Sequence, residues 1–265
     1  MRYTKRSDTL GLLLALLVAA GCGGGEQRAA EEGAVGGETG AETMASVVDE
    51  ATAATVAGSV MFVGTAPEAT MIDMSEESVC ADKYDAPKYS EEVVVSENGT
   101  LASVFVYVKE GLEDMTFPVP QEPVVLDQAG CWYTPRVFGL QVGQEMVIKN
   151  SDGILHNINA KPSINRGFNI SQPVVMETKR TFRSPEVMIP LECDVHGWMQ
   201  AYVGVLDHPY YSVTGAHGSF SLAPLPPGTY VIEAWHEVYG TQTQEVTVGE
   251  GEELEIAFSF GEPSA

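Results

Sequence analysis

One short stretch decides the fold of this chain of 265 residues. It reads Cys193-Asp194-Val195-His196-Gly197-Trp198-Met199. The apolar runs 187–192 and 201–206 on either side of it are each typical of a β-strand. The stretch is therefore predicted to be a tight loop between two strands, and it brings a thiol, an imidazole and a thioether close together.

This set of donor atoms favours one kind of metal. A soft thiolate, imidazoles and a weak thioether suit copper that cycles between two oxidation states. Such a site needs a second histidine, and the candidate is His156, shortly after the apolar run 145–149. A zinc site built from Cys193, His196 and His156 is chemically possible. Thioethers are poor zinc ligands, so Met199 favours copper.

The pattern of His156-Asn157 followed by Cys193, His196 and Met199 resembles the type 1 blue copper proteins (cupredoxins), and the loop spacing is similar to that of amicyanin. The resemblance covers roughly residues 125–207. It implies a Greek-key β-sandwich with one copper ion held in a trigonal site by the two histidines and the cysteine. It also implies that the methionine is a weak axial ligand.

Three neighbours of these ligands are candidates for supporting roles: Asn157, Asn150 and Trp198. The resemblance implies that Asn157 braces the cysteine-bearing loop by hydrogen bonds, which would orient the ligands. A plain turn residue is the alternative for this position. Trp198 is expected to pack over the site and exclude water, or to belong to the core.

A second resemblance begins after His208. The stretches Gly218-Ser219-Phe220-Ser221-Leu222 and Leu225-Pro226-Pro227-Gly228-Thr229-Tyr230 resemble the carboxypeptidase regulatory-like (transthyretin-like) β-sandwich. Two N-terminal segments, 58–60 and 102–106, fit the opening strands of that family. An all-β chain is therefore predicted, in which the cupredoxin-like unit is inserted into the regulatory-like sandwich, with two tandem domains as the alternative.

The predicted organisation has five parts. They are a signal peptide at 1–21, a disordered acidic Gly/Ala linker at 22–54, the first part of the regulatory-like sandwich at 55–110, the cupredoxin-like domain at 111–207 and the second part of the regulatory-like sandwich at 208–265.

The N-terminus predicts the compartment. A basic start precedes the apolar run 10–20, which is too short to span a bilayer. The following Ala19-Ala20-Gly21-Cys22 resembles the lipobox of bacterial lipoproteins, which implies a lipid on Cys22 and stable anchoring to a membrane. Gly at position 23 favours the outer membrane, so we expect the protein in the cell envelope, on the periplasmic side or at the surface. An ordinary signal peptide is the alternative.

The remaining cysteines can pair in more than one way. If Cys22 carries lipid, three are left in an oxidising compartment, where an odd thiol is paired or functional. A disulfide between Cys80 and Cys131 leaves Cys193 as a thiolate ligand, whereas pairing Cys131 with Cys193 would destroy the copper site. The ligand set around Cys193 favours the first pairing.

The charge restricts the partners. Lys plus Arg is 14 and Asp plus Glu is 37, a net charge of −23. This argues against nucleic-acid binding and could steer a basic redox protein towards the chain. Solubility, or adaptation to a salty medium, is the simpler explanation.

The predicted function is that of a single-electron carrier, with a cytochrome or a copper oxidase as partner and the exposed edge of His196 as the electron port. No catalytic motif is present, so no enzyme is predicted. One alternative is a lipoprotein that binds or delivers copper without electron transfer. Another is a surface module for carbohydrate or protein, with aromatic residues such as Tyr210, Tyr211 and Tyr239. His208 and His217 are expected at the surface.

Overall fold

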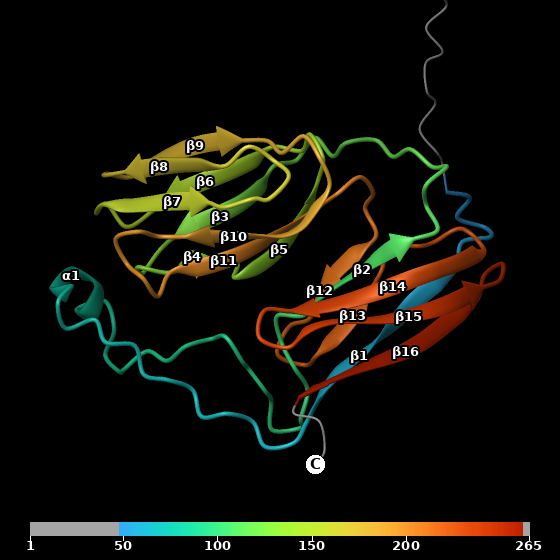
Figure 1. Cartoon of the computed structure of the whole chain (residues 1–265), viewed down its shortest axis with the longest axis horizontal. Coiled ribbons are helices and arrows are strands. Elements are labelled where there is room, and N and C mark those ends of the chain that lie inside the picture. Colours follow the sequence, from blue (N-terminus) through green and yellow to red (C-terminus); the bar gives the residue numbers. More distant parts are fainter. Residues whose placement is uncertain (1–47, 262–265) are drawn as a thin grey trace, which may run out of the picture. The chain divides into compact units, whose positions relative to one another are not determined.

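The computed structural model describes residues 48–261, all of which belong to one compact unit. This part of the chain has sixteen strands and one short helix, which confirms the all-β prediction (Figure 1). None of its helices has the length and apolarity that crossing a membrane requires. The predicted signal peptide, most of the linker and the lipidation site Cys22 lie outside the described residues.

The first sandwich combines segments from the two ends of the described chain. One sheet has the order β13 (Ser219–Ser221), β1 (Thr55–Val63), β16 (Glu253–Gly261). The other has the order β12 (Tyr211–Val213), β2 (Phe105–Glu110), β14 (Gly228–His236), β15 (Gly240–Val248). Parallel pairing of β1 with β16 along their whole length joins the beginning of this sandwich to its end.

Alternating side chains explain why these segments form half-buried strands. In β16 the residues Phe258 and Phe260 are buried while their neighbours face solvent, as the period of two in a strand requires. β14 and β15 form a hairpin whose turn ends at Gly240, which has a φ of 72°. Glycine adopts this left-handed conformation without a steric penalty, so it closes the turn.

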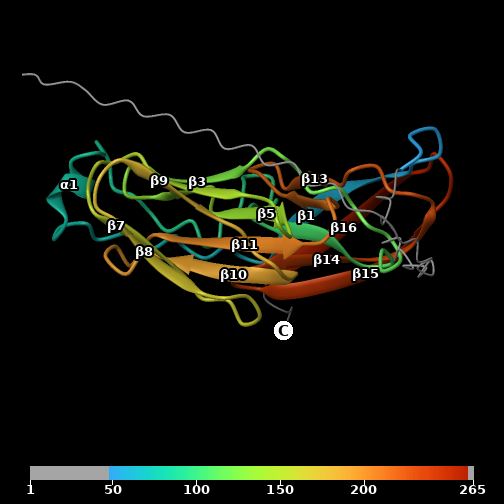
Figure 2. The same ribbon diagram turned by 90° about the horizontal axis from the view of Figure 1, so that it is seen from above.

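The second sandwich is built from the middle of the chain. One sheet has the order β4 (Tyr133–Thr134), β3 (Val124–Gln128), β6 (Met146–Asn150), β9 (Met176–Arg180). The other has the order β5 (Val137–Gln141), β11 (Gln200–Leu206), β10 (Glu186–Glu192), β7 (His156–Ala160), β8 (Phe168–Gln172). Figure 2 shows β10 and β11 running side by side in the second of these sheets. All of these strands pair only with one another, so the second sandwich is inserted between β2 and β12.

The direction of the strands determines which of the proposed ligand residues come together. β7 runs antiparallel to β10, with Asn159 opposite Glu192. The last two residues of each strand face each other, so the beginning of β7 continues past the end of β10 and lies beside the loop of residues 193–199. His156, the first residue of β7, and Cys193 are brought together by this pairing although they are far apart in sequence.

Close packing and one ion pair join the two sandwiches. Gly204 of β11 lies under the ring of Phe105 of β2, where a Cβ atom would come within 2.5 Å of that ring. The ring of Tyr211 covers Gly139 in the same way, and its hydroxyl donates to the Gly139 carbonyl at 2.8 Å. Only glycine leaves room for these rings, so two of the glycines in the second sandwich serve the joint between the sandwiches.

The ion pair is that of Arg136 with Glu237. The guanidinium donates two hydrogen bonds, of 2.6 and 2.7 Å, to the carboxylate. The two side chains are only 8% and 5% exposed. Breaking a buried pair leaves an uncompensated charge, which costs more than the pair itself contributes.

We therefore expect Arg136→Met to lower the free energy of unfolding by about 3 kcal/mol or more, because Glu237 loses its partner. Urea unfolding followed by circular dichroism measures this loss. The double variant Arg136→Met/Glu237→Gln should recover part of the stability. As a matched control, Lys179→Met removes an exposed ion pair with Glu145 and should have no comparable effect.

Candidate metal centre

The loop after β10 is held closed by its own backbone. The Cys193 amide donates to the Met199 carbonyl at 3.1 Å, and the Met199 amide donates to the His196 carbonyl at 2.9 Å. These bonds turn the side chains of Cys193 and His196 towards the beginning of β7. The tight loop predicted from the sequence is present, between the two predicted strands.

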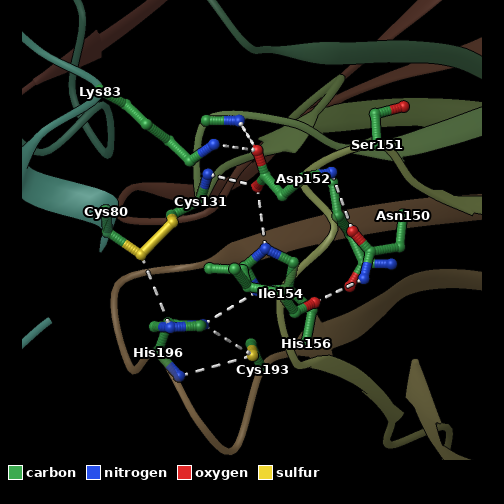
Figure 3. A network of polar contacts seen from close by, with 12 residues as sticks. Cys80, Lys83, Cys131, Asn150, Ser151, Asp152, Ile154, His156, Cys193 and His196 are labelled. Atoms are coloured by element: carbon green, nitrogen blue, oxygen red, sulfur yellow. Dashed lines mark hydrogen bonds and ion pairs between the residues drawn. A yellow bond between two sulfur atoms is a disulfide. The ribbon is translucent and has the colours of Figure 1, made fainter. Parts of the chain in front are cut away.

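Two imidazoles and a thiol face one another at this point (Figure 3). His156 Nδ1 lies 3.0 Å from His196 Nδ1, and Cys193 Sγ lies 3.7 Å from His196 Nδ1. One nitrogen from each histidine and the Cys193 sulfur all lie within 4.8 Å of one another. The three residues are buried, and so is Met199, at 1% exposure.

The donor atoms fit a metal ion of the predicted kind. Two histidine nitrogens that are each about 2.0 Å from one ion must lie roughly 3–4 Å apart, and a thiolate sulfur binds only slightly further out. The separations of 3.0 and 3.7 Å meet this condition. Soft sulfur together with imidazole is the set that copper prefers. The chain thus has a buried His/Cys/Met cluster that is consistent with a copper site.

Asp152 orients His156 from its outer side. Asp152 Oδ2 lies 2.8 Å from His156 Nε2, so the imidazole presents Nδ1 inwards. Burial opposes ionisation of this carboxyl, but the backbone amide of Cys131, the ammonium of Lys83, His156 and the amide of Gly130 outweigh it. Together they lower the pKa of Asp152 to about 2. The carboxylate is therefore charged and fixed at neutral pH.

The thiol of Cys193 lies among groups that favour its anion. Burial alone would raise its pKa, but hydrogen bonds involving His156, Asn157 and the amides of the loop outweigh this, and the pKa is lowered. The His196 amide points at the sulfur at 3.4 Å. A thiolate is the form of cysteine that binds metals.

The two histidines respond to burial differently. Burial lowers the pKa of His156, but its contacts with Cys193 and Asp152 outweigh burial and the net pKa is raised. For His196, burial and the neighbouring His156 both lower the pKa. His196 therefore stays neutral at physiological pH, as a metal ligand must.

Asn157 clamps the two sides of the site together. Its Oδ1 accepts from the Asp194 amide at 2.7 Å and from Cys193 Sγ at 3.3 Å. Its Nδ2 donates to Asn169 Oδ1 at 2.8 Å and to Asp194 Oδ2 at 3.0 Å. Asn157 is thus a brace of the cysteine-bearing loop, and not merely a turn residue.

Asn150 and Trp198 hold the neighbouring segments. Asn150 Nδ2 donates to the carbonyls of Ile154 and Gln172, and its Oδ1 accepts from the Asp152 amide, so it fixes the loop that carries Asp152. The indole of Trp198 lies with its ring centre 5.3 Å from that of His196 and donates to the Cys131 carbonyl at 3.0 Å. Both residues support the site from outside the ligand set.

The exposed edge predicted for His196 is wrong. His196 is only 1% exposed, because a segment of the connection between β1 and β2 covers its outer edge. This segment contains α1 (Ser78–Ala81), and its Cys80 Sγ lies 3.6 Å from His196 Nε2. A disulfide joins Cys80 to Cys131, and Cys193 is a free thiol.

Sequence reasoning missed Asp152 and Lys83. The spacing of Asp152, four residues before His156, was a weak local signal for a carboxylate partner. Lys83 lies 2.9 Å from Asp152 Oδ1, and no local pattern indicates a contact between residues so distant in sequence.

The other histidines lie away from the cluster. His208 is buried at 5% exposure, so the surface position predicted for it is wrong; it packs beside the rings of Phe117 and Tyr210. His217 is exposed, as expected. His236 is fully buried and accepts a hydrogen bond from the Val238 amide.

The comparisons with known proteins find both resemblances. Residues 200–260 match the sequence model of the carboxypeptidase regulatory-like domain. The match begins at the first residue of β11, a strand of the second sandwich, and continues through the C-terminal strands of the first sandwich. No curated protein sequence matches the chain.

Among solved structures, the chain is similar to copper proteins. A copper-containing nitrite reductase from Thermus scotoductus SA-01 is 18% identical, with 38% of this chain and 25% of that chain covered and a TM-score of 0.31. An oxidised proline-to-alanine variant of amicyanin is 19% identical, with 31% and 81% covered and a TM-score of 0.29. An oxidised proline-to-glycine variant is 17% identical, with 38% and 97% covered and a TM-score of 0.29.

The chain thus spans about a quarter of the reductase and most of the amicyanin chains. The resemblances to the regulatory-like domain and to cupredoxins are confirmed as similarities. Identities and TM-scores are low, so the case for a metal rests on the side chains described above.

The pKa of Asp152 leads to a testable acid dependence. A carboxyl whose pKa falls from 3.8 to about 2 on folding stabilises the fold above pH 4 and loses that contribution between about pH 4 and pH 2. After allowance for solvent screening, the contribution is about 1–2 kcal/mol. We expect the unfolding free energy of Asp152→Asn to fall less than that of the wild type between pH 5 and pH 3. Urea unfolding of the metal-free proteins at both pH values measures this, and parallel losses would contradict the assignment.

Proposed function

We propose that this protein carries single electrons through a type 1 copper site, outside the cytoplasm and held at a membrane by a lipid on Cys22. The observation that carries the proposal is the convergence of His156 Nδ1, His196 Nδ1 and Cys193 Sγ in a buried site that also contains Met199. The anchor and the compartment rest on the sequence of residues 1–23 alone.

The four proposed ligands have different roles. Copper bound here would supply a one-electron couple. His156, His196 and Cys193 would bind it, and Met199 would be a weaker ligand that tunes the potential. Burial of all four residues excludes water, so the site has no open position for a substrate. This favours electron transfer over catalysis, and we propose no catalytic residue.

The surroundings keep the ligands in place. Asn157 fixes the cysteine-bearing loop, Asp152 fixes the His156 ring, and the disulfide lies against His196. Hydrogen bonds from outer residues hold ligands in one orientation in metal sites generally. A site that changes little between two oxidation states has a small barrier to electron exchange, which is what a carrier needs.

The partner is proposed to be a basic redox protein, such as a cytochrome or a copper oxidase. The net charge of −23 supports this, because opposite charge speeds diffusional encounter. We expect the rate of electron exchange with a cationic partner to fall steeply as salt is added.

Neither alternative function has a feature that favours it. A protein that delivers copper needs an accessible ligand, whereas the four ligands here are buried. A binding surface of aromatic rings is not supported either: Tyr210 is 1% exposed, and Tyr211 stacks on Phe105 inside the joint between the sandwiches.

The direct test is the visible spectrum after copper(II) is added to the protein from residue 48 on. We expect an intense blue or green band from the Cys193 thiolate and its complete loss in Cys193→Ser, because only a thiolate–copper bond gives this absorption. The spectrum is read together with electron spin resonance. A wild-type protein that stays colourless after copper(II) is added would contradict the proposal.

Substitution of Met199 gives a second test. Met199→Gln places a harder oxygen donor near the metal, which stabilises copper(II) and should lower the reduction potential. Met199→Leu removes the donor and should raise it. Voltammetry measures both shifts; equal potentials in the three proteins would show that Met199 is not a ligand.

A further inference from the structure

A segment held by a disulfide covers the outer side of His196 and is linked to His156 through Asp152. We call residues 72–88 the cap. Its ends meet at the bridge between Met71 and Tyr89, where the Ile72 amide donates to the Lys88 carbonyl at 2.9 Å. Between these ends the cap carries α1 and reaches from the first sandwich to the metal centre of the second, as the teal segment of Figure 1 shows.

The cap reaches His196 through Cys80. Cys80 is fully buried, its Sγ lies 3.6 Å from His196 Nε2, and it is bonded to Cys131. Glu77 Oε2 lies 4.0 Å from the same nitrogen. The imidazole is therefore enclosed, with its Nδ1 turned to the metal position and its Nε2 edge against the disulfide (Figure 3). It cannot rotate outwards while the cap is in place.

The cap reaches His156 through Lys83. The ammonium lies 2.9 Å from Asp152 Oδ1, and Asp152 Oδ2 lies 2.8 Å from His156 Nε2. Asp152 also accepts from the amides of Gly130 and Cys131, at 2.7 Å each. One carboxylate thus connects the cap, the turn that holds Cys131 and a metal ligand.

The cap has further contacts with the second sandwich, most of them made by partly exposed side chains. Met74 is buried against the core of that sandwich, Ile72, Ala81 and Tyr84 pack partly buried against it, and the Tyr84 hydroxyl donates to the Gly130 carbonyl at 2.6 Å. The Lys88 ammonium lies 5.0 Å from the centre of the Trp132 ring. The helix has only four residues, and much of the cap faces solvent. A segment that is largely exposed and has one short helix opens at lower cost than the strands of the core, and a disulfide restrains such opening.

We propose that the cap is a lock on the metal centre: with Cys80 bonded to Cys131 and Lys83 bonded to Asp152, it controls the access of solvent and metal to the two histidines. Cys80 and Lys83 are positioning residues, since they act on the metal through His196 and through Asp152 with His156. The part that concerns metal rests on the proposed function. The closure over His196 is a property of the chain with or without metal.

The lock differs from a disulfide that only stabilises the fold. Such a disulfide raises the stability of the whole sandwich, and metal is then lost only when the whole sandwich unfolds. A lock lets the cap open while the strands stay folded, so metal release and cap opening change together and the strands are unaffected.

The copper-loaded experiment measures release to an excess of chelator in four proteins. The variants are Cys80→Ala/Cys131→Ala, Lys83→Met and the control Lys179→Met, which removes an exposed lysine pair, that with Glu145. Loss of the strap should speed release at least about tenfold. Loss of the Lys83 pair should speed it about two- to fivefold. The control should release copper at the wild-type rate.

The metal-free experiment treats the same four proteins with diethyl pyrocarbonate and maps the modified histidines by mass spectrometry. His196 should be protected in the wild type and the control, and should react in the cap variants. The exposed His217 and the fully buried His236 are internal references for reaction and protection. Amide exchange should rise in residues 72–88 and stay unchanged in β7 and β10.

The outcomes separate the two proposals. A wild type that takes up no copper ends the proposed function, while the reactivity of His196 still decides whether the cap is a closure. A blue protein whose cap variants release copper at the wild-type rate overturns the lock and leaves the electron carrier intact. Equal loss of protection in the cap and in β7 means unfolding of the whole sandwich and also overturns the lock.

Discussion

The antiparallel pairing of β7 with β10 is the constraint on which the site depends. It places the start of β7 beside the loop that follows β10, and the Asn157 side chain then joins them by accepting from the Asp194 amide at 2.7 Å. The strand pairing brings the two segments close together, and the hydrogen bond to the Asn157 side chain fixes the position of the loop. Without this join the Cys193 loop would be an ordinary turn, and its sulfur would have no fixed relation to His156.

Burial makes this arrangement costly and also useful. The site keeps the imidazoles of His156 and His196, the Cys193 thiol and the Asp152 carboxylate out of water, and each needs a partner to be tolerated there. The partners found are one another, the Lys83 ammonium and backbone amides. Since these groups satisfy each other in only one geometry, the same contacts that offset desolvation also orient the donor atoms. A metal ion would take the place of the contact between the two Nδ1 atoms.

The insertion of one sandwich into another has a consequence for this site. The connection between β1 and β2 belongs to the first sandwich in sequence but ends against the metal centre of the second. Large rings over Gly139 and Gly204, with the buried pair of Arg136 and Glu237, fix the two sandwiches to each other. The cap, which is connected to the first sandwich, can then keep a fixed position over the ligands of the second sandwich.

The sequence alone determined what is local. Alternating apolar residues define the strands, and the close spacing of Cys193, His196 and Met199 defines a metal-binding loop, because three donors on one short loop need no distant contact to meet. His156 is predicted as the second histidine because such a donor set needs one and because it follows an apolar run, and the family resemblance agrees with this choice. Only the tertiary structure decided what surrounds this loop. The burial of His196 under Cys80, and the link from Lys83 to Asp152, join residues far apart in the chain, and no periodicity or spacing encodes such contacts.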